Sequence, residues 1–396
     1  MGALDGLKVL ELGQVVAAPF CGALLADMGA DVIKVEAPSG DSLRHMGPLK
    51  DGRSMWYLVE NRNKRSISLD LKNPEGCRIL EELIVKADIM TENFKPGVLE
   101  KLGFSWERIS KLNPRIILAR MSGYGQTGPY SNRYGYDRIG VGMGGLAYLT
   151  GFEDRAPLKP GVSAADYLVG YSAAVGILAA VYERDVIGSG IGQVIDIGLH
   201  EPVFRISEFT ALDYHLTGNI RERIGNSFVG TAPSGHWQTK DGKWIAVTCG
   251  NDRIFKRLAK LVEHEEWLER PEFATHPLRI INRKELDEGV EAWVAGKTAA
   301  ECFAILGQDV PVGPINSIED IFADPHIAAR ENLIEVADKY WGKVKMQGIV
   351  PKMSRTPGKV DSTGPDLGEN TNEVLINILG YTLEQVEALR QRNAIR

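Results

Sequence analysis

Apolar and polar positions alternate with two different periods in the first third of the chain. Short apolar runs have the length and composition of strands, at residues 8–12, 31–35, 66–71, 87–91 and 115–121. Helical spacing at residues 19–28 separates the first two runs, and Asn73-Pro74-Glu75 opens another helix after the third. This order predicts βαβ units, and therefore a parallel sheet in an α/β doubly wound domain.

The pattern changes in the middle of the chain. Residues 167–182 carry no formal charge and are rich in Gly and Ala, which predicts a central helix with closely packed neighbours. The stretch is too short and too rich in small residues for a membrane span, so we expect no membrane partner. A helical pattern then continues from Glu201 to about His215.

A second, smaller segment follows. Residues 218–234 form a polar linker, and residues 236–247 read as a β-hairpin around Lys240-Asp241-Gly242. Three helices complete an α+β segment, at residues 253–263, 285–294 and 299–306, and two more follow at 372–379 and 383–394.

Composition narrows the function classes. A chain of 396 residues with 44% hydrophobic residues allows two globular domains, and the net charge of −6 argues against nucleic acid as a partner. The four cysteines are scattered without a Cys-x-x-Cys pair, which favours reduced thiols over disulfides or a metal site. The N-terminus enters a strand-like run at once, and we expect a cytoplasmic protein.

Two loops exclude familiar nucleotide sites. The turn at residues 13–19 lacks Gly-x-Gly-x-x-Gly, which disfavours a dinucleotide oxidoreductase. The Gly-rich loop at residues 122–130 lacks the Gly-Lys-Ser/Thr ending of a P-loop.

Positive residues cluster instead on loops at predicted strand ends. Lys72, Lys95 and Lys101 lie where ligands of open α/β sheets bind, and Phe94 could stack on a base. These residues therefore suggest a phosphorylated ligand, while solvated loop charges with Phe94 in the core are the alternative.

Asp166 is a candidate functional residue with two possible roles. It lies in the first turn of the Gly- and Ala-rich helix, where a carboxylate meets the positive end of the helix dipole. Helix capping explains an Asp at this place, and catalysis is the alternative.

An ordered set of motifs resembles the class III CoA-transferases, which include formyl-CoA transferase, carnitine CoA-transferase and succinyl-CoA-dependent dicarboxylate transferases. The set spans nearly the whole chain: Leu7–Glu11, Leu24–Glu36, Asn63–Ile67, Glu92–Gly97, Ser122–Gly125, the helix with Asp166, Gly190–Asp196 and Leu367–Thr371.

The resemblance implies a fold and an assembly. It implies a Rossmann-like large domain built from both chain ends, here residues 1–217 and 326–396, a smaller α+β domain at residues 218–325, and an interlocked, ring-shaped homodimer. The substrates would be an acyl-CoA and a carboxylate, with no tightly bound cofactor.

The resemblance also implies site residues. Asp166 would be the nucleophile, forming an acyl anhydride and then an aspartyl-CoA thioester. Contacts to CoA would come from Val16, Ala17, Leu69, Lys72, Asn93, Phe94, Lys95, Lys101, Tyr134, Tyr136 and Asp137. Ala37 stands where formyl-CoA transferase has a phosphate-binding Arg, so phosphate binding would depend on Arg44, Lys72 or Lys101.

Alternatives within the family concern the reaction and the substrate. Racemisation of 2-methylacyl-CoA needs a His before the Asp in the position of Tyr136-Asp137, and Tyr is a poor base near neutral pH. Loss of catalysis, leaving a CoA-binding protein, is a further alternative. Succinyl-CoA is the expected donor and a dicarboxylic acid the expected acceptor, with Arg221, Arg223 and Asn226 as candidates for the distal carboxylate. The loop Thr248–Asn251 of the partner chain would help to close the site.

Overall fold

The computed structural model describes residues 2–396 and divides into two compact units. The larger unit holds the N-terminal residues up to Ala147, residues 159–219 and residues 331–396. The smaller unit holds residues 148–158 and 220–330.

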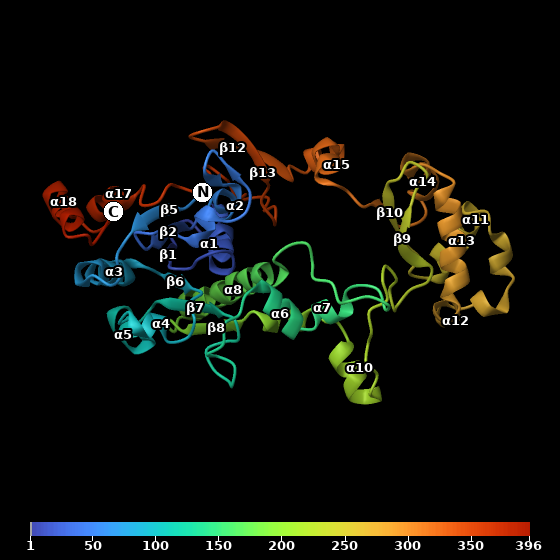
Figure 1. Ribbon diagram of the computed structural model, residues 1–396, viewed down its shortest axis with the longest axis horizontal. Coiled ribbons are helices and arrows are strands. Elements are labelled where there is room, and N and C mark those ends of the chain that lie inside the picture. Colours follow the sequence, from blue (N-terminus) through green and yellow to red (C-terminus); the bar gives the residue numbers. More distant parts are fainter. Residues whose placement is uncertain (1) are drawn as a thin grey trace. The chain divides into compact units, whose positions relative to one another are not determined.

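The larger unit is built on the predicted parallel sheet (Figure 1). Its six strands are β1 (Lys8–Glu11), β2 (Asp31–Glu36), β5 (Arg65–Ser68), β6 (Ile89–Glu92), β7 (Ile117–Ser122) and β8 (Val194–Gly198). They lie in the order β5-β2-β1-β6-β7-β8, all parallel. The third, second and first strands are thus followed by the fourth, fifth and sixth, which is the doubly wound order. The prediction of an α/β fold with a parallel sheet is confirmed.

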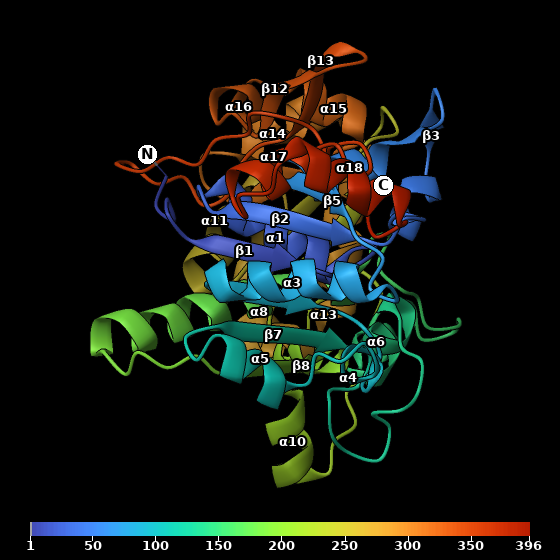
Figure 2. The same cartoon turned by 90° about the vertical axis from the view of Figure 1, so that its left-hand side faces the viewer.

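Helices cover both faces of this sheet because its strands alternate between two apolar clusters. Val9 belongs to the cluster with α1 (Ala17–Asp27) and α8 (Ala164–Tyr182), and its neighbour Leu10 belongs to the cluster on the other face. Figure 2 shows α3 and α5 on that second face, with α17 and α18 alongside β5. The helices of this unit are, besides α1 and α8, α2 (Met55–Glu60), α3 (Pro74–Lys86), α4 (Val98–Lys101), α5 (Trp106–Leu112), α6 (Asp137–Met143), α9 (His200–Arg205), α10 (Thr210–Thr217), α17 (Thr371–Asn377) and α18 (Leu383–Gln391).

The Gly- and Ala-rich helix α8 lies close against α1. A Cβ on Gly170 would come within 2.7 Å of the Phe20 ring and 3.0 Å of the Ala17 carbonyl oxygen, so a larger residue there would separate the two helices. Residues 164–187 are long and apolar enough to cross a membrane, but core helices meet the same criterion, and the inner face of α8 is buried against α1 and the sheet.

Shorter elements complete the larger unit. They are η1 (Ser42–His45), β3 (Leu49–Lys50), β4 (Arg53–Ser54), the short α7 (Leu146–Leu149) at the junction of the units, η2 (Glu183–Ile187), and the hairpin β12 (Leu333–Asp338) with β13 (Gly342–Gln347). The helical pattern predicted to continue to His215 is wrong as one helix, because the chain breaks between α9 and α10 with Glu208 at a φ of 57°.

The smaller unit has its own sheet and core. Its antiparallel strands β9 (Ser234–Gln238), β10 (Trp244–Thr248) and β11 (Val312–Pro314) pack with Trp237, Phe255 and Trp267 in one cluster. Its helices are α11 (Asp252–Leu261), η3 (Glu265–Leu268), η4 (Pro271–Phe273), α12 (His276–Ile281), α13 (Arg283–Ala295), α14 (Ala299–Leu306), α15 (Ile318–Ala323) and α16 (Pro325–Ala329).

One segment differs from the predicted division of the chain. Residues 148–158 belong to the smaller unit, although they were predicted to belong to the large domain. The amide of Gly225 donates to the Gly151 carbonyl (2.8 Å), and the Arg223 guanidinium donates to the carbonyls of Tyr148 and Phe152. These hydrogen bonds fasten the segment to residues 220–225.

Candidate functional site

A cavity of about 200 Å³ lies at the carboxyl ends of the central strands. The strand order reverses between β1 and β6, and ligands of doubly wound sheets bind at this switch point. The residues after both strands reach the cavity, whose lining consists of Gln14, Val15, Val16, Ala17, Ser42, Asn93, Phe94, Met121, Ser122, Gly123, Gly135, Tyr136, Asp166 and Leu199.

The loop after β1 is tied to the loop after β6. The Gln14 amide donates to the side-chain oxygen of Asn93 (2.8 Å), and the Asn93 side-chain nitrogen donates back to the Gln14 carbonyl (2.7 Å). Val15 follows with a φ of 63°, a strained conformation for a β-branched residue. The loop therefore has one defined conformation, and it leads directly into α1.

Two glycines bring another loop to the cavity. A Cβ on Gly123, just after β7, would lie 2.6 Å from the Cα of Gly135, so the two backbones touch. This contact places Tyr136 and Asp137 beside the end of β7. The Gly-rich loop thus serves close backbone packing at the site rather than a P-loop.

Asp166 has none of the partners that a capping residue would have. Its side chain is half-buried, and within residues 2–396 it has no hydrogen-bond or ion-pair partner. The cap belongs to Asp137, whose Oδ1 accepts a hydrogen bond from the Ala165 amide (2.8 Å). The capping interpretation of Asp166 is therefore wrong.

The electrostatic surroundings of Asp166 oppose its charge. Burial, followed by the negative charges of Asp137 and Glu60, raises the pKa of Asp166 from 3.8 to about 7. An unpaired carboxylate with such a pKa, exposed to a cavity, is typical of a functional group.

Glu60 lies close to Asp166 through the next residue of α8. The hydroxyl of Tyr167 donates to Glu60 Oε1 (2.7 Å), and so does Nε1 of Trp56 (3.2 Å). The pKa of Glu60 is raised, because burial outweighs the opposite effect of these hydrogen bonds and of the charge of Lys64.

One group of the predicted CoA contacts lies at the cavity. Val16, Ala17, Asn93, Phe94 and Tyr136 line the cavity with Asp166, and Phe94 also packs against the core cluster of the larger unit. Asp137 reaches the same place through its contact with the end of α8.

A second group lies outside the cavity lining. The ammonium of Lys95 lies 4.5 Å from the ring centre of Tyr134, which is 78% exposed. Lys72 and Lys101 are exposed, in keeping with either phosphate binding or solvation. Leu69 is different, because its side chain is fully buried in the core and it forms a β-bridge with Ile395, so only its backbone could meet a ligand.

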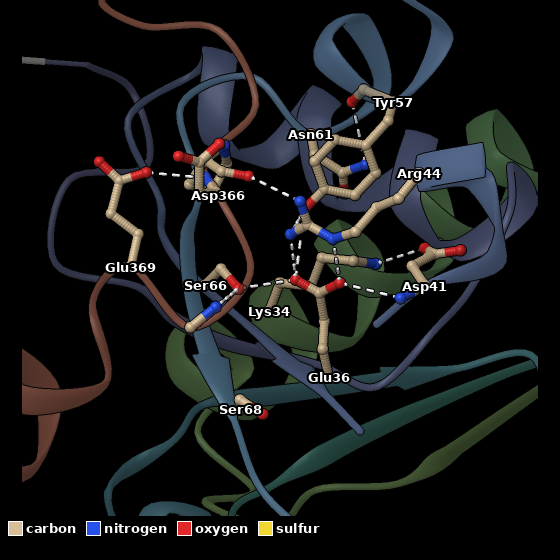
Figure 3. Close-up of polar contacts among 12 residues, drawn as sticks. Lys34, Glu36, Asp41, Arg44, Tyr57, Asn61, Ser66, Ser68, Asp366 and Glu369 are labelled. Atoms are coloured by element: carbon tan, nitrogen blue, oxygen red, sulfur yellow. Dashed lines mark hydrogen bonds and ion pairs between the residues drawn. The ribbon is translucent and has the colours of Figure 1, made fainter. Parts of the chain in front are cut away.

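The candidate role of Arg44 in phosphate binding is wrong. Its guanidinium donates to both oxygens of Glu36 (2.8 and 2.6 Å), to the hydroxyl of Tyr57 (2.5 Å) and to the carbonyl of Pro365 (3.1 Å). Figure 3 shows this guanidinium enclosed among acceptors. Arg44 instead connects β2 to the C-terminal segment, and Glu36 has a pKa lowered to about 2, because the hydrogen bond from Arg44 and the charge of Lys34 outweigh its burial.

The candidates for the distal carboxylate lie in the smaller unit. Arg223 is occupied by the carbonyls of Tyr148, Phe152 and Arg155, so it has a structural role that the sequence did not suggest. Asn226 is exposed, and Arg221 is part-buried. In the loop Thr248–Asn251, Asn251 caps α11 by accepting from the Ile254 amide.

Several residues of the cavity were missed. Gln14, Val15, Ser42, Met121, Ser122 and Leu199 line it, and the rule that ligands bind at carboxyl strand ends would have found Gln14 and Val15 once β1 was recognised. The described part of the chain has no group of three or more His, Cys, Asp or Glu side chains placed to hold a metal ion. Tyr136, rather than a His, precedes Asp137 at this wall of the cavity.

Comparison with known proteins gives the family. The profile of CoA-transferase family III matches residues 4–371. The chain is 44% identical over 395 residues to the succinyl-CoA--D-citramalate CoA-transferase of Chloroflexus aurantiacus, covering 99% of this chain and 98% of that protein. It is 43% identical to the β subunit of the succinyl-CoA--L-malate CoA-transferase of the same organism, with the same two coverages.

A solved structure shows the same fold. A CAIB/BAIF family protein from Brucella suis superposes with a TM-score of 0.84 at 36% identity, covering 95% of this chain and 99% of that one. The chain belongs to CoA-transferase family III and is a class III CoA-transferase.

Proposed function

We propose that the protein transfers CoA from succinyl-CoA to a dicarboxylic acid, with Asp166 as the nucleophile. The observation that supports this role is the carboxylate of Asp166, which is half-buried, unpaired within residues 2–396 and exposed to the cavity at the switch point. A carboxylate free of hydrogen bonds keeps its lone pairs available for attack.

The reaction proceeds through two kinds of covalent intermediate. An Oδ of Asp166 attacks the thioester carbonyl carbon, the C–S bond breaks, and CoA leaves as a thiolate with the electron pair, which gives a mixed anhydride. The thiolate then attacks the Asp166 carbonyl carbon and releases succinate, which leaves an aspartyl-CoA thioester. The acceptor carboxylate attacks the carbonyl carbon of this thioester, the C–S bond breaks, and CoA leaves again as a thiolate, which gives an anhydride between the acceptor and Asp166. The thiolate then attacks the acyl carbon of the acceptor, which forms the new acyl-CoA and releases Asp166 as a carboxylate.

Each of these steps develops an oxyanion that needs fixed donors. The first amides of α1 have no intrahelical acceptor, and no side chain caps them. Val16 and Ala17 line the same cavity as Asp166, so their amides are suited to stabilise the oxyanion, assisted by the positive end of the helix dipole.

The relatives support the choice of substrates. The names of both relatives from Chloroflexus pair succinyl-CoA with a hydroxy-dicarboxylic acid, D-citramalate or L-malate. A hydroxy-dicarboxylic acid of four or five carbons is therefore the acceptor class that we propose.

Trapping tests the covalent role. The protein is incubated with succinyl-CoA, quenched with hydroxylamine, and digested for mass spectrometry. We expect the mass of the peptide with Asp166 to increase by the difference between a carboxylic acid and its hydroxamate. The Asp166→Asn variant should show no such increase and should lose turnover. Labelling of another carboxylate, or parent-level turnover by Asp166→Asn, would exclude this nucleophile.

A panel of donors and acceptors tests the substrates. We expect transfer from succinyl-CoA to malate or a similar acid. Turnover with another acyl-CoA but none with succinyl-CoA would overturn the choice of donor.

We also propose that two chains form an interlocked homodimer, as the resemblance to the class III CoA-transferases implies. The outer face of α8 exposes Tyr171, Val175 and Tyr182, with Val175 68% exposed, and α10 exposes Leu212 and Leu216. Apolar faces of this kind mark interfaces. Sedimentation should give the mass of two chains, and Val175→Lys should weaken the association.

A cytoplasmic location is a further proposal. The four cysteines form no disulfide, and three of them are buried, which suits a reducing compartment. Cell fractionation with an antibody against the protein would test it.

A further inference from the structure

A buried ionic cluster lies beneath the loop after β1. Lys34, in the middle of β2, has no exposed surface, and its ammonium contacts Glu11 Oε1 (3.0 Å), the Gly13 carbonyl (2.8 Å) and Asp41 Oδ2 (3.0 Å). Glu11 in turn pairs with the buried Lys64 (2.8 Å). Two lysines and two carboxylates therefore form a neutral group without contact to water.

The ammonium of Lys34 stays charged in this environment. Burial acts to lower the pKa of Lys34, but the charges of Glu11, Asp41 and Glu36 raise it above its ordinary value. The ion pair with Asp41 is drawn in Figure 3, below Arg44.

The other oxygen of Asp41 holds the wall of the cavity. Asp41 is 1% exposed, and its Oδ1 accepts hydrogen bonds from the amides of Val15 (3.0 Å) and Leu43 (2.9 Å). Val15 and Ser42, the neighbour of Leu43, both line the cavity with Asp166. One carboxylate thus fixes two separate parts of the cavity wall.

Asp41 maintains a backbone conformation of the loop after β1 that is unfavourable by itself. Val15 has a φ of 63°, which a β-branched residue rarely adopts, and the next residues begin α1. Such a conformation persists only where the surroundings determine it, here Asp41 on one side and Asn93 on the other.

We propose that Asp41, held by Lys34, is a positioning residue for CoA transfer, because it fixes the backbone from Gln14 to Ala17 against the reacting carbonyl group. The proposal depends on the site around Asp166 proposed above. Asp41 acts through the loop and does not touch the substrate. Its effect belongs to the covalent steps, so kcat should change more than the KM for acyl-CoA.

Two charge-balanced double variants test this role. Lys34→Met/Asp41→Asn and Lys34→Met/Asp41→Ala both remove one charge of each sign, but only the first keeps an acceptor oxygen for the Val15 and Leu43 amides. We expect kcat to fall in the order parent, Asn variant, Ala variant, with the two variants about tenfold apart and the KM for acyl-CoA within about threefold of the parent.

A matched pair elsewhere in the same unit is the control. Asp27 is buried with Arg62 (2.5 Å) and does not line the cavity. Arg62→Met/Asp27→Asn and Arg62→Met/Asp27→Ala should have equal kcat. Equal kcat in the two Asp41 variants would show that Asp41 contributes to folding alone and would overturn the proposal, as would parent-level kcat in the Lys34→Met/Asp41→Asn variant.

Two more measurements separate the possible failures. Asp166→Asn is assayed in parallel, so that an active Asp166→Asn removes the proposed site, whereas an inactive one with equal Asp41 variants removes only the role of Asp41. Hydrogen exchange of the parent protein covers the case in which the Asp41 variants do not fold. We expect the Val15 amide to exchange as slowly as the strands of the sheet, and exchange at the rate of an open loop would overturn the proposal.

Discussion

The raised pKa of Asp166 predicts that removing its charge makes the protein more stable. The pKa is about 7 in the folded protein and 3.8 in an unfolded chain, so the folded state binds more protons between these values. Stability therefore falls as the pH rises from about 4 to about 7. At pH 8 this amounts to about 4 kcal/mol at most, since one pKa unit corresponds to about 1.4 kcal/mol.

The variant that tests this is Asp166→Asn, which keeps the shape and removes the charge. Its gain in the free energy of unfolding should be about 1.5 kcal/mol at pH 5 and should grow by about 2–3 kcal/mol between pH 5 and pH 8. Turnover should be lost at the same time, because the nucleophile is gone.

Urea unfolding measures the effect at both pH values. The seven tryptophans report the transition, and the protein concentration is held constant because association adds to apparent stability. Glu36→Gln is the control for a buried carboxylate whose ion pair with Arg44 lowers its pKa to about 2, and it should be destabilised at pH 8. A loss of stability in Asp166→Asn, or an equal gain at both pH values, would refute the electrostatic account of the site.

Four further predictions follow from individual contacts. Asp137→Asn keeps an acceptor for the Ala165 amide but removes a negative charge beside Asp166, so the pKa of Asp166 should fall and the acid limb of kcat/KM should move to lower pH; an unmoved limb would contradict this. Arg44→Met should lower the free energy of unfolding by about 3–5 kcal/mol without raising the KM for acyl-CoA in the folded protein, whereas a raised KM would restore Arg44 as a phosphate ligand. Lys95→Ala should raise the KM for acyl-CoA by about two- to fivefold at low salt with kcat unchanged, and the exposed Lys111→Ala, on α5, should have no effect. Gly123→Ala should lower kcat, because the new Cβ would meet the Cα of Gly135 at 2.6 Å and push the loop with Tyr136 away from β7, and a fully active variant would show that this contact is dispensable.

The fold was predictable where burial determines the pattern. The strands of the parallel sheet are covered on both faces and therefore read as continuous apolar runs, from which the βαβ order followed. The hairpin of β12 and β13 was missed for the converse reason. Most of its side chains are exposed or half-buried, with Val336 and Met346 among the few that are buried, so its sequence resembles a polar loop.

The site was predictable only in part, because its contacts join distant parts of the chain. Asp166 was identified from a resemblance, and its sequence position alone favoured the wrong role, that of a cap. Its actual distinction comes from Asp137 and Glu60, which lie 29 and 106 positions earlier and whose proximity no local pattern reveals. Arg44 was misassigned for the same reason, since one of its acceptors is the carbonyl of Pro365, 321 residues away.

The charges beneath the cavity are paired, whereas the charge within the cavity is not. Lys34, Lys64, Glu11 and Asp41 are fully buried, yet each has a partner of opposite sign within 3.0 Å. Asp166 is less buried and has no partner within the described residues. Nothing in the packing of α8 requires a carboxylate there, because Asp137 already caps the helix. The charge of Asp166 destabilises the fold, and the neighbouring carboxylates increase this effect. The chemistry of the cavity explains why an Asp is present, because attack on a thioester requires an ionised and unpaired oxygen.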